Sequence, residues 1–445
     1  MPEEVSTIST GSLVLTLGLG FLLLVLPRRY ALAPMLIGGC YLTLGQALVI
    51  AGLHFYLIRI LIFFALIRIV IRREIFYVKL NGIDKVFIGW ILAVTFLYLI
   101  FSGNYATLNE RLGNLYNSIG IYFFARSLIW SFDDVVLTVK MLAIIILPLA
   151  MLFAVEHATG KNPFYVFGGV SEFSEIRDGR IRCQGPFRHP ILAGTFGATV
   201  MPLFVGLWVY NARNRLLAIG GFLAATFIVF TASSGGPLMA YITGLVGLIC
   251  WVFRYQMRAI RWGIVFLFMA LTLYMKAPIW FVISHLSGLV GGGGWYRSAL
   301  IDAAIRHFNE WWLIGTEYTA HWMPFSLATN PNMVDITNHF IAQGVNGGLL
   351  ALLLFIWLIV KCFQATGKAI HNEESYSGQE QFMIWSLGCA VLCHVASFFS
   401  VSYFDQIIIF WYLNIALIAT IAPHQNGVLD ESEPKTGPGA LQFST

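Results

Sequence analysis

Long apolar runs constrain this chain more than any other feature of its sequence. A helix needs about 20 apolar residues to cross a bilayer, and about thirteen runs of nearly that length follow one another along the chain. They lie near residues 11–26, 31–51, 55–71, 83–101, 114–130, 135–155, 188–209, 215–232, 237–253, 259–276, 339–361, 382–401 and 404–422. Only 11% of the 445 residues are charged, against about 25% in a soluble domain. The sequence therefore predicts an all-α, polytopic transmembrane bundle of about 12–13 spans, with residues 1–445 in one membrane domain.

Clusters of basic residues in the short loops set the expected orientation. With thirteen spans, all the clusters fall on one side of the membrane, which the positive-inside rule assigns to the cytoplasm. They comprise Arg28, Arg29, Arg72, Arg73, Lys79, Lys85, Arg213, Arg215, Arg254, Arg258 and Arg261. The net charge of +5 is thus explained by topology. We expect the lipid bilayer as a partner and no nucleic acid.

Two long connections, near 156–187 and 277–338, fall on the opposite, outer side. The second is the largest hydrophilic segment. It opens with the flexible run Gly291–Gly294 and continues into an expected helix over 295–312. The last residues, 426–445, are polar and rich in Pro, Gly and Ser. They are predicted to form a disordered cytoplasmic tail.

A short basic segment, residues 180–190, lies just before the seventh span. Arg180, Arg182, Arg188 and His189 crowd into it, and Pro190 then starts a helix whose N-terminal dipole is positive. The planar fork of arginine matches phosphate oxygens, so the segment predicts a lipid-linked phosphate or pyrophosphate. The alternative is a solvated loop or a set of headgroup anchors. Some of its arginines would then pair with nearby acids, namely Glu172, Glu175 and Asp178.

Two further residues stand at the borders of the large outer loop. Arg297 opens the expected loop helix, and His339 lies where the chain re-enters the membrane. A histidine can accept a proton from a hydroxyl group near neutral pH. The loop also holds His285, His307 and His321, but their spacing does not suggest a metal cage. We therefore expect no metal and no cofactor.

Taken in order, these segments resemble the O-antigen ligase family, which includes O-antigen and exopolysaccharide polymerases. The resemblance covers roughly residues 110–420 and rests on three short motifs. They are Arg182-Cys-Gln-Gly-Pro-Phe187 leading into Pro190, then Arg297 with a later Gly315, and finally His339 with Gly344, Gly347 and Gly348. The run from Thr231 to Gly236 lacks the arginine that many relatives carry there, and Phe340 stands where relatives often have Asn.

The resemblance implies a membrane glycosyltransferase of the C type in the bacterial inner (plasma) membrane. Its donor would be an undecaprenyl-pyrophosphate-linked glycan, used at the periplasmic face without metal or nucleotide sugar. The acceptor hydroxyl would belong to lipid A core or to a growing polysaccharide. Arg182 and Arg297, with Arg188 and Arg180, would bind the pyrophosphate, and His339 would orient or deprotonate the acceptor. His321 and His189 are secondary candidates.

The main alternative is a transporter or flippase for an anionic lipid-linked glycan. Transporters more often show inverted repeats, broken helices and charges at the membrane midplane. Here the informative charges fall in the outer loops. The sequence therefore favours an enzyme.

Overall fold

The computed structural model describes residues 6–50, 53–102, 105–285, 294–324, 331–372 and 374–422. The predicted hinge residues 291–293 and the predicted tail 426–445 lie outside the described residues. Fifteen α-helices are described: α1 (Thr10–Val25), α2 (Ala33–Tyr41), α3 (Leu57–Ile71), α4 (Gly82–Ser102), α5 (Tyr105–Leu128), α6 (Phe132–Thr159), α7 (Pro190–Tyr210), α8 (Arg215–Thr231), α9 (Gly235–Ile249), α10 (Met257–Tyr274), α12 (Gly294–Arg306), α13 (Phe308–Trp311), α14 (His339–Ile370), α15 (Gly378–Phe398) and α16 (Gln406–Ile421).

Short elements fill the connections. The strands are β1 (Ser6–Thr7), β2 (Gln46–Ile50), β3 (Leu53–Tyr56), β4 (Glu175–Arg177) and β5 (Arg180–Arg182). The 3-10 turns are η1 (Arg28–Tyr30), η2 (Glu74–Tyr77), η3 (Pro163–Phe167), η4 (Ala212–Asn214), η5 (Cys250–Gln256), η6 (Ile279–Phe281) and η7 (Ala320–Trp322). Within the described chain, seven helical stretches are long and apolar enough to cross a membrane, one of which joins α9 to α10. The prediction of an all-α, multi-pass membrane protein is confirmed at this level.

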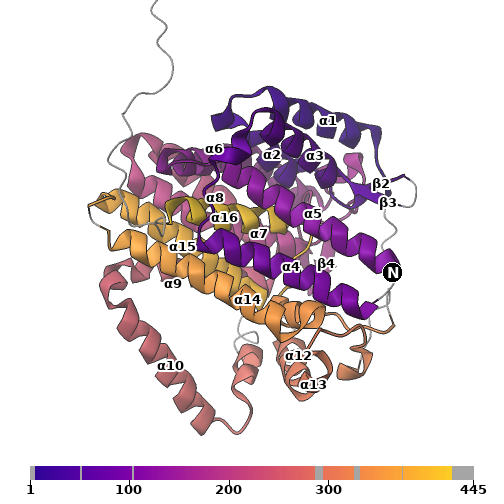
Figure 1. Cartoon of the computed structure of the whole chain (residues 1–445), viewed down its shortest axis with the longest axis vertical. Coiled ribbons are helices and arrows are strands. Elements are labelled where there is room, and N and C mark those ends of the chain that lie inside the picture. The colour runs from indigo at the N-terminus through magenta and orange to yellow at the C-terminus, as the bar shows by residue number, and fades with distance from the viewer. Residues whose placement is uncertain are drawn as a thin grey trace, which may run out of the picture.

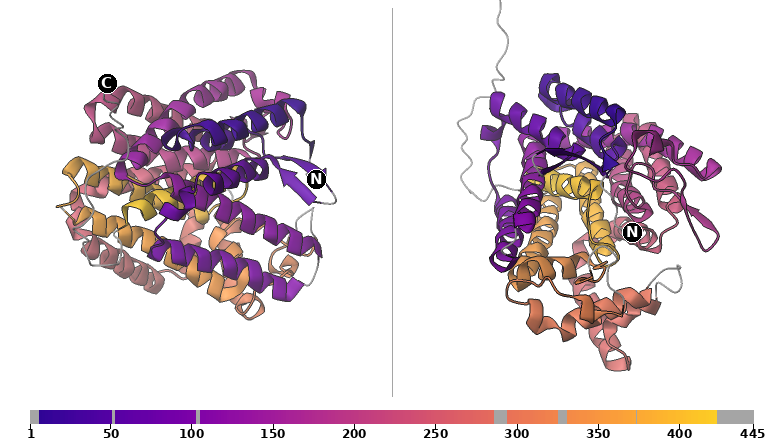
Figure 2. Two further views of the ribbon diagram at one scale, coloured as in Figure 1. Left: turned by 45° about the horizontal axis from the view of Figure 1, so that its top comes forward. Right: turned by 90° about the vertical axis from the view of Figure 1, so that its right-hand side faces the viewer.

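Helix α7 forms the centre of the bundle and is the most deeply buried of the seven stretches. Its glycines allow neighbouring helices to approach closely: Gly194 faces Pro237, Gly197 faces the Ala225 carbonyl, and Gly206 faces Ser386. A Cβ atom at Gly197 would lie 2.7 Å from that carbonyl oxygen. Helix α16 also lies inside the bundle, between α5 and α7 (Figure 2). In contrast, α10 lies apart from the others (Figure 1) and buries none of its residues.

The prediction of a continuous span over 31–51 is wrong. Helix α2 ends at Tyr41, and the chain then turns into β2, which pairs antiparallel with β3 and parallel with β1. The buried Gln46 side chain explains this break. It accepts a hydrogen bond from the Ser9 N–H (2.7 Å) and donates to Thr43 Oγ1 (2.6 Å) and the Gly168 carbonyl (3.2 Å). Buried polar groups need such partners, and the partners here come from segments outside the helix.

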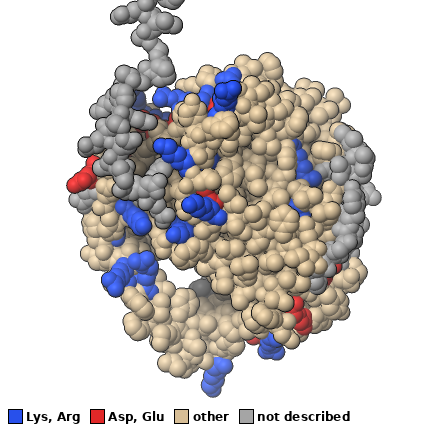
Figure 3. All heavy atoms as spheres, in the orientation of Figure 1, with Lys and Arg blue, Asp and Glu red and all other residues tan. Residues whose placement is uncertain are grey.

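The two ends of the bundle differ in charge and in loop length. At the basic end lie the short loops, together with three ion pairs: Arg28–Asp134 (2.8 Å), Arg68–Glu74 (2.8 Å) and Arg126–Asp84 (2.9 Å). On the face drawn in Figure 3 most Lys and Arg side chains lie on the left, whereas β2 and β3 lie on the right of the same view in Figure 1. We call this opposite side the long-loop end. It carries the connections 160–189 and 399–405 and the described parts of the connection 275–338, namely 275–285, 294–324 and 331–338.

Helix α14 is broken near the long-loop end. Gly347 has φ −168° and ψ 21°, and Gly348 has φ 67° and ψ −170°. The positive φ of Gly348 is a conformation that favours glycine. The loop segment that follows α13 docks against the break. The Leu349 N–H donates to the Trp312 carbonyl (2.7 Å), and the Thr316 N–H donates to the Val345 carbonyl (2.9 Å). Residues 339–346 therefore form a separate half-helix, held in place by the segment around Trp312 and Thr316.

Candidate functional site

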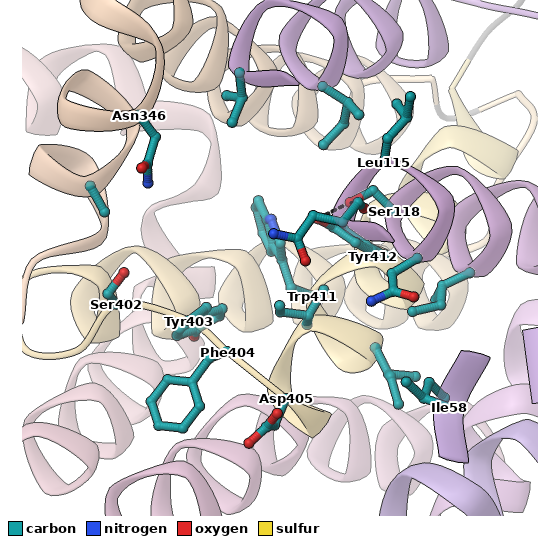
Figure 4. Close-up of a pocket in the computed structure, with 18 of the residues that line it drawn as sticks. Ile58, Leu115, Ser118, Asn346, Ser402, Tyr403, Phe404, Asp405, Trp411 and Tyr412 are labelled. Atoms are coloured by element: carbon teal, nitrogen blue, oxygen red, sulfur yellow. Dashed lines mark hydrogen bonds between the residues drawn. The ribbon is translucent and has the colours of Figure 1, made fainter. Parts of the chain in front are cut away.

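A cavity of about 450 Å³ lies at the long-loop end. Its walls come from α3, α4, α5, the half-helix of α14 and the segment 402–412. Figure 4 shows Asn346, Tyr403, Asp405 and Trp411 around this space, with Ser118 and Tyr412 joined by a hydrogen bond of 2.9 Å. The cavity is large enough for a small polar group such as a pyrophosphate and part of a sugar.

Three arginines and two carboxylates line the cavity: Arg59, Arg111, Arg188, Glu110 and Asp405. The Arg111 guanidinium donates to Asn346 Oδ1 (2.9 Å) and stacks 3.7 Å from the centroid of the Tyr98 ring. Arg188 Nε lies 3.4 Å from Asp405 Oδ2. The arginines outnumber the acids, so the lining favours an anionic ligand.

His339 lines the same cavity and is only 8% exposed. It begins α14, whose N-terminus is capped by Asn338 through the N–H groups of Phe340 and Ile341. The backbone N–H of Tyr403 donates to His339 Nδ1 (3.1 Å). Because a backbone N–H can only donate, this contact favours the neutral tautomer with its lone pair on Nδ1 and its proton on Nε2.

Gln343 completes the surroundings of this ring. Its Oε1 accepts a hydrogen bond from Trp90 Nε1 (3.0 Å), and its Nε2 lies 3.3 Å from His339 Nε2. Because Trp90 fixes the amide oxygen, the Gln343 nitrogen faces the ring as a donor, and this contact favours a lone pair on His339 Nε2. A neutral ring accepts at only one nitrogen, so it satisfies either the Tyr403 N–H at Nδ1 or the Gln343 amide at Nε2.

Asp405 holds an unusual backbone conformation, with φ 51° and ψ −135° just before α16. This region is costly for a residue with a Cβ atom, and such strain concentrates at functional sites. Its carboxylate faces Arg188. Both features support a functional role for Asp405, which the sequence did not single out.

Of the predicted arginines, Arg188 lines the cavity, whereas Arg182 and Arg180 belong to the β4–β5 hairpin. Arg182 is 4% exposed, and its Nη1 donates to both carboxylate oxygens of Glu175 (2.8 and 2.7 Å). Its Nη2 lies 3.4 Å from Ser234 Oγ. Arg180 is exposed beyond the hairpin turn. Arg182 therefore pairs with one of the nearby acids, as the alternative interpretation of this segment expects.

Arg297 lies half-buried in α12. Burial, and then the charge of nearby Arg177, lower the pKa of Arg297 from its usual value. A partly desolvated guanidinium beside a second one attracts anions. Arg297 is not among the residues that line the cavity. The structure thus brings Arg297 close to Arg177, which lies outside the family motif.

The two secondary histidines have local roles. His189 caps α7, because its Nδ1 accepts the Ile191 N–H (3.0 Å). His321 Nε2 lies 3.0 Å from the Glu310 carboxylate, which also receives hydrogen bonds from Trp322 and His307. Burial acts to raise the pKa of Glu310, but the hydrogen bonds from Trp322, His321 and His307 outweigh it and lower the pKa to about 2.

Arg59, Glu110, Arg111 and Asp405 were not predicted as site residues from the sequence. Helix α5 begins at Tyr105, before the predicted span at 114, so Glu110 and Arg111 had been placed in a loop. A signal was present in the spacing of Arg111, Asn114 and Ser118. Polar residues three and four positions apart share one helix face, and a polar face on a membrane helix indicates a functional surface.

In comparisons with known proteins, the chain matches no protein-family model and no curated protein. The resemblance to the O-antigen ligase family therefore stays a prediction based on the three motifs.

Proposed function

We propose that this protein is a metal-independent glycosyltransferase of the O-antigen ligase or polymerase type. It transfers a glycan from undecaprenyl pyrophosphate to an acceptor hydroxyl at the periplasmic face of a bacterial inner membrane. The observation that carries the proposal is the cavity at the long-loop end, where His339 and Arg188 meet Arg59 and Arg111. The acceptor is lipid A core or a growing polysaccharide.

In this mechanism the cavity arginines bind the pyrophosphate of the donor. The acceptor oxygen forms a bond to the anomeric carbon while the bond from that carbon to the phosphate oxygen breaks. Arg111 and Arg188 stabilise the negative charge that develops on the departing pyrophosphate. Since this leaving group is already good, the protein supplies mainly positioning and charge.

His339 then orients the acceptor. In the tautomer that the Tyr403 N–H favours, its Nε2–H donates a hydrogen bond to the acceptor oxygen. The proton lost by the hydroxyl passes to a carboxylate that lines the cavity. Asp405, which lies beside Arg188, is the candidate. If the ring instead adopts the other tautomer, His339 itself takes that proton as a general base. Variants at His339 separate these two roles.

The test is reconstitution of the full chain with defined substrates. The purified protein in liposomes receives a defined undecaprenyl-pyrophosphate oligosaccharide together with lipid A core or an oligosaccharide acceptor. We expect release of undecaprenyl pyrophosphate coupled to a longer product, and product length separates ligase from polymerase. An Arg29→Ala variant, changed at an exposed residue of the basic end, is the matched control. Absence of product with every acceptor from well-folded protein would contradict the proposal.

The break in α14 favours a second candidate, transport of an anionic lipid-linked glycan, because broken helices beside a polar cavity are common in transporters. The same liposomes distinguish it. A fluorescent donor that crosses the bilayer intact, without release of the lipid, indicates a flippase.

A further inference from the structure

A second group of polar side chains lies in the outer loop, apart from the cavity. His307 Nδ1 lies 2.7 Å from Glu310 Oε1, and His321 Nε2 lies 3.0 Å from the same carboxylate. One ligand atom from each of the three residues lies within 4.8 Å of the others. The two imidazole rings are 4.7 Å apart at 89°. Three side chains that commonly bind metals thus converge on one point.

We propose that His307, Glu310 and His321 bind a divalent transition metal ion, with Zn²⁺ the best-matched metal. Two histidines and one glutamate form a known zinc ligand set, with water in the fourth position. Bonds of about 2.0–2.1 Å in a tetrahedral site place neighbouring ligand atoms about 3.3 Å apart. The observed 2.7 and 3.0 Å separations need only small outward shifts to admit the ion.

Aromatic neighbours hold the three ligands in place. Trp322 Nε1 donates to Glu310 Oε2 (3.0 Å) and thereby leaves Oε1 directed at the histidines. The Trp322 ring also stacks on His307 with a centroid distance of 5.8 Å, and Tyr318 stacks on His321 at 5.0 Å. Partners of this kind fix ring orientation and raise metal affinity. The three side chains are thus already restricted before the metal binds, so binding loses less conformational entropy.

The sequence did not predict this site because its ligands lie on different elements. His307 stands between α12 and α13, Glu310 lies in α13, and His321 belongs to η7. The spacing of 307, 310 and 321 matches no zinc motif on one helix. Only the fold of the loop brings the three side chains together.

The metal would brace the loop segment that docks against the break in α14. Trp311, next to Glu310, packs on Gly344, where a Cβ atom would lie 2.6 Å from the ring. The Trp312 carbonyl and the Thr316 N–H bond to the backbone at the break. A metal that links α13 to η7 therefore stabilises the loop segment against which the half-helix beginning at His339 packs. This role takes no part in the transfer step and does not depend on the proposed function.

The test uses the full chain, purified in detergent with a histidine-free affinity tag and stripped with EDTA. We expect Zn²⁺ to bind with one-to-one stoichiometry in calorimetry and to raise the Tm. Co²⁺ should give the intense visible absorption of a tetrahedral site. Affinity should fall by about tenfold or more in His321→Ala and Glu310→Gln.

His285→Ala is the matched control, since His285 is an exposed histidine outside the cluster. It should bind Zn²⁺ like the wild type. His307→Gln keeps a polar side chain of similar reach and tests the site if an alanine variant fails to fold. Absence of stoichiometric binding in the wild type, or unchanged binding in folded His307→Gln and His321→Ala, would overturn the proposal. Transfer activity is not part of this readout, so its loss or retention bears only on the proposed function.

Discussion

At the basic end of the bundle Arg68 and Arg126 lie buried against Glu74 and Asp84, whereas at the long-loop end Arg111 and Arg188 line a cavity. The first pair of arginines has carboxylate partners at 2.8 and 2.9 Å. In the cavity Arg111 bonds to an amide, and Arg188 Nε is 3.4 Å from its carboxylate. Arg68 and Arg126 therefore serve packing, whereas Arg111 and Arg188 place their charges at the wall of the cavity. The predictions that follow test this difference, from the largest expected effect to the smallest.

His339→Ala should reduce the rate of transfer by about 10²–10⁴-fold, the range for loss of a catalytic proton-handling group. His339→Gln restores an N–H donor near the position of Nε2. If His339 orients the acceptor, the Gln variant should recover part of the rate, whereas a general base would not be replaced. Single-turnover rates on protein of confirmed monodispersity measure the difference. Wild-type rates in His339→Ala would remove this residue from the mechanism.

The ion pair at the basic end should matter for folding alone. Asp84→Ala leaves the buried Arg126 guanidinium without its carboxylate, which costs about 3–5 kcal/mol. A double variant, Asp84→Leu with Arg126→Met, should cost much less, because both charges are removed together. Thermal unfolding in detergent measures both. The rate of transfer per folded molecule should stay near that of the wild type. A loss of this rate without a loss of stability would contradict a purely structural role for the ion pair.

Arg188→Ala and Arg111→Ala should each lower the rate by about 10²–10³-fold, as for loss of one group that stabilises developing charge. Lysine at either position should recover only part of it, because a planar fork becomes a point charge. The family resemblance predicts equally large losses for Arg182→Ala and Arg297→Ala. Those two variants decide whether the donor reaches beyond the cavity toward the hairpin and α12. Full activity in Arg188→Ala would exclude that residue from donor binding.

Removal of a bound metal by a chelator should lower the thermal stability of the protein but leave the rate of transfer unchanged. If the loop histidines hold a metal, EDTA should lower the Tm by an amount that corresponds to about 2.7 kcal/mol when the free ion stands at a hundred times its Kd. The initial rate of transfer well below that Tm should not change, because the transfer mechanism uses no metal. A differential scan and an initial-rate assay on the same sample measure the two quantities. Immediate loss of rate at an unchanged Tm would place a metal in the chemistry.

Single cysteine substitutions, which should perturb the protein least, test which end of the bundle faces the outside of the cell. Lys161→Cys is exposed at the long-loop end and should react with an impermeant thiol reagent in whole cells. Ser375→Cys, exposed at the basic end, should react only after permeabilisation. The wild type is a clean background at Cys183, where burial and then the charge of Glu156 raise the thiol pKa to about 12. The reverse labelling pattern would reverse the assigned topology.

Much of the fold could be predicted from local sequence. Runs of apolar residues near bilayer length became helices, and Pro190 starts α7 as expected. The failure at 31–51 shows the limit of this approach. Hydropathy there resembles that of a span, but Gln46 finds hydrogen-bond partners on two distant segments, at Ser9 and Gly168, and the helix ends at Tyr41. Long-range polar contacts of this kind leave no periodic signal.

The site was predicted less completely than the fold. His339 and Arg188 were named, and they line one cavity. Arg59, the adjacent pair Glu110 and Arg111, and Asp405 were missed because they belong to three elements far apart in the sequence. Arg182 stood out because of its motif, yet its guanidinium is bound to Glu175. Spacing along a chain cannot reveal which acid an arginine will meet.

By itself the sequence determined a helical membrane protein and the positions of most helices. It also determined the two segments that carry Arg188 and His339 at the long-loop end. Those features follow from the cost of exposing backbone polar groups to lipid, which acts locally along the chain. Only the tertiary structure decided which arginines line the cavity, which donors face the His339 ring and that His307, Glu310 and His321 converge. Each depends on contacts between elements far apart in the sequence, such as the Tyr403 N–H on His339 Nδ1. Those contacts form only when helix packing brings the elements together.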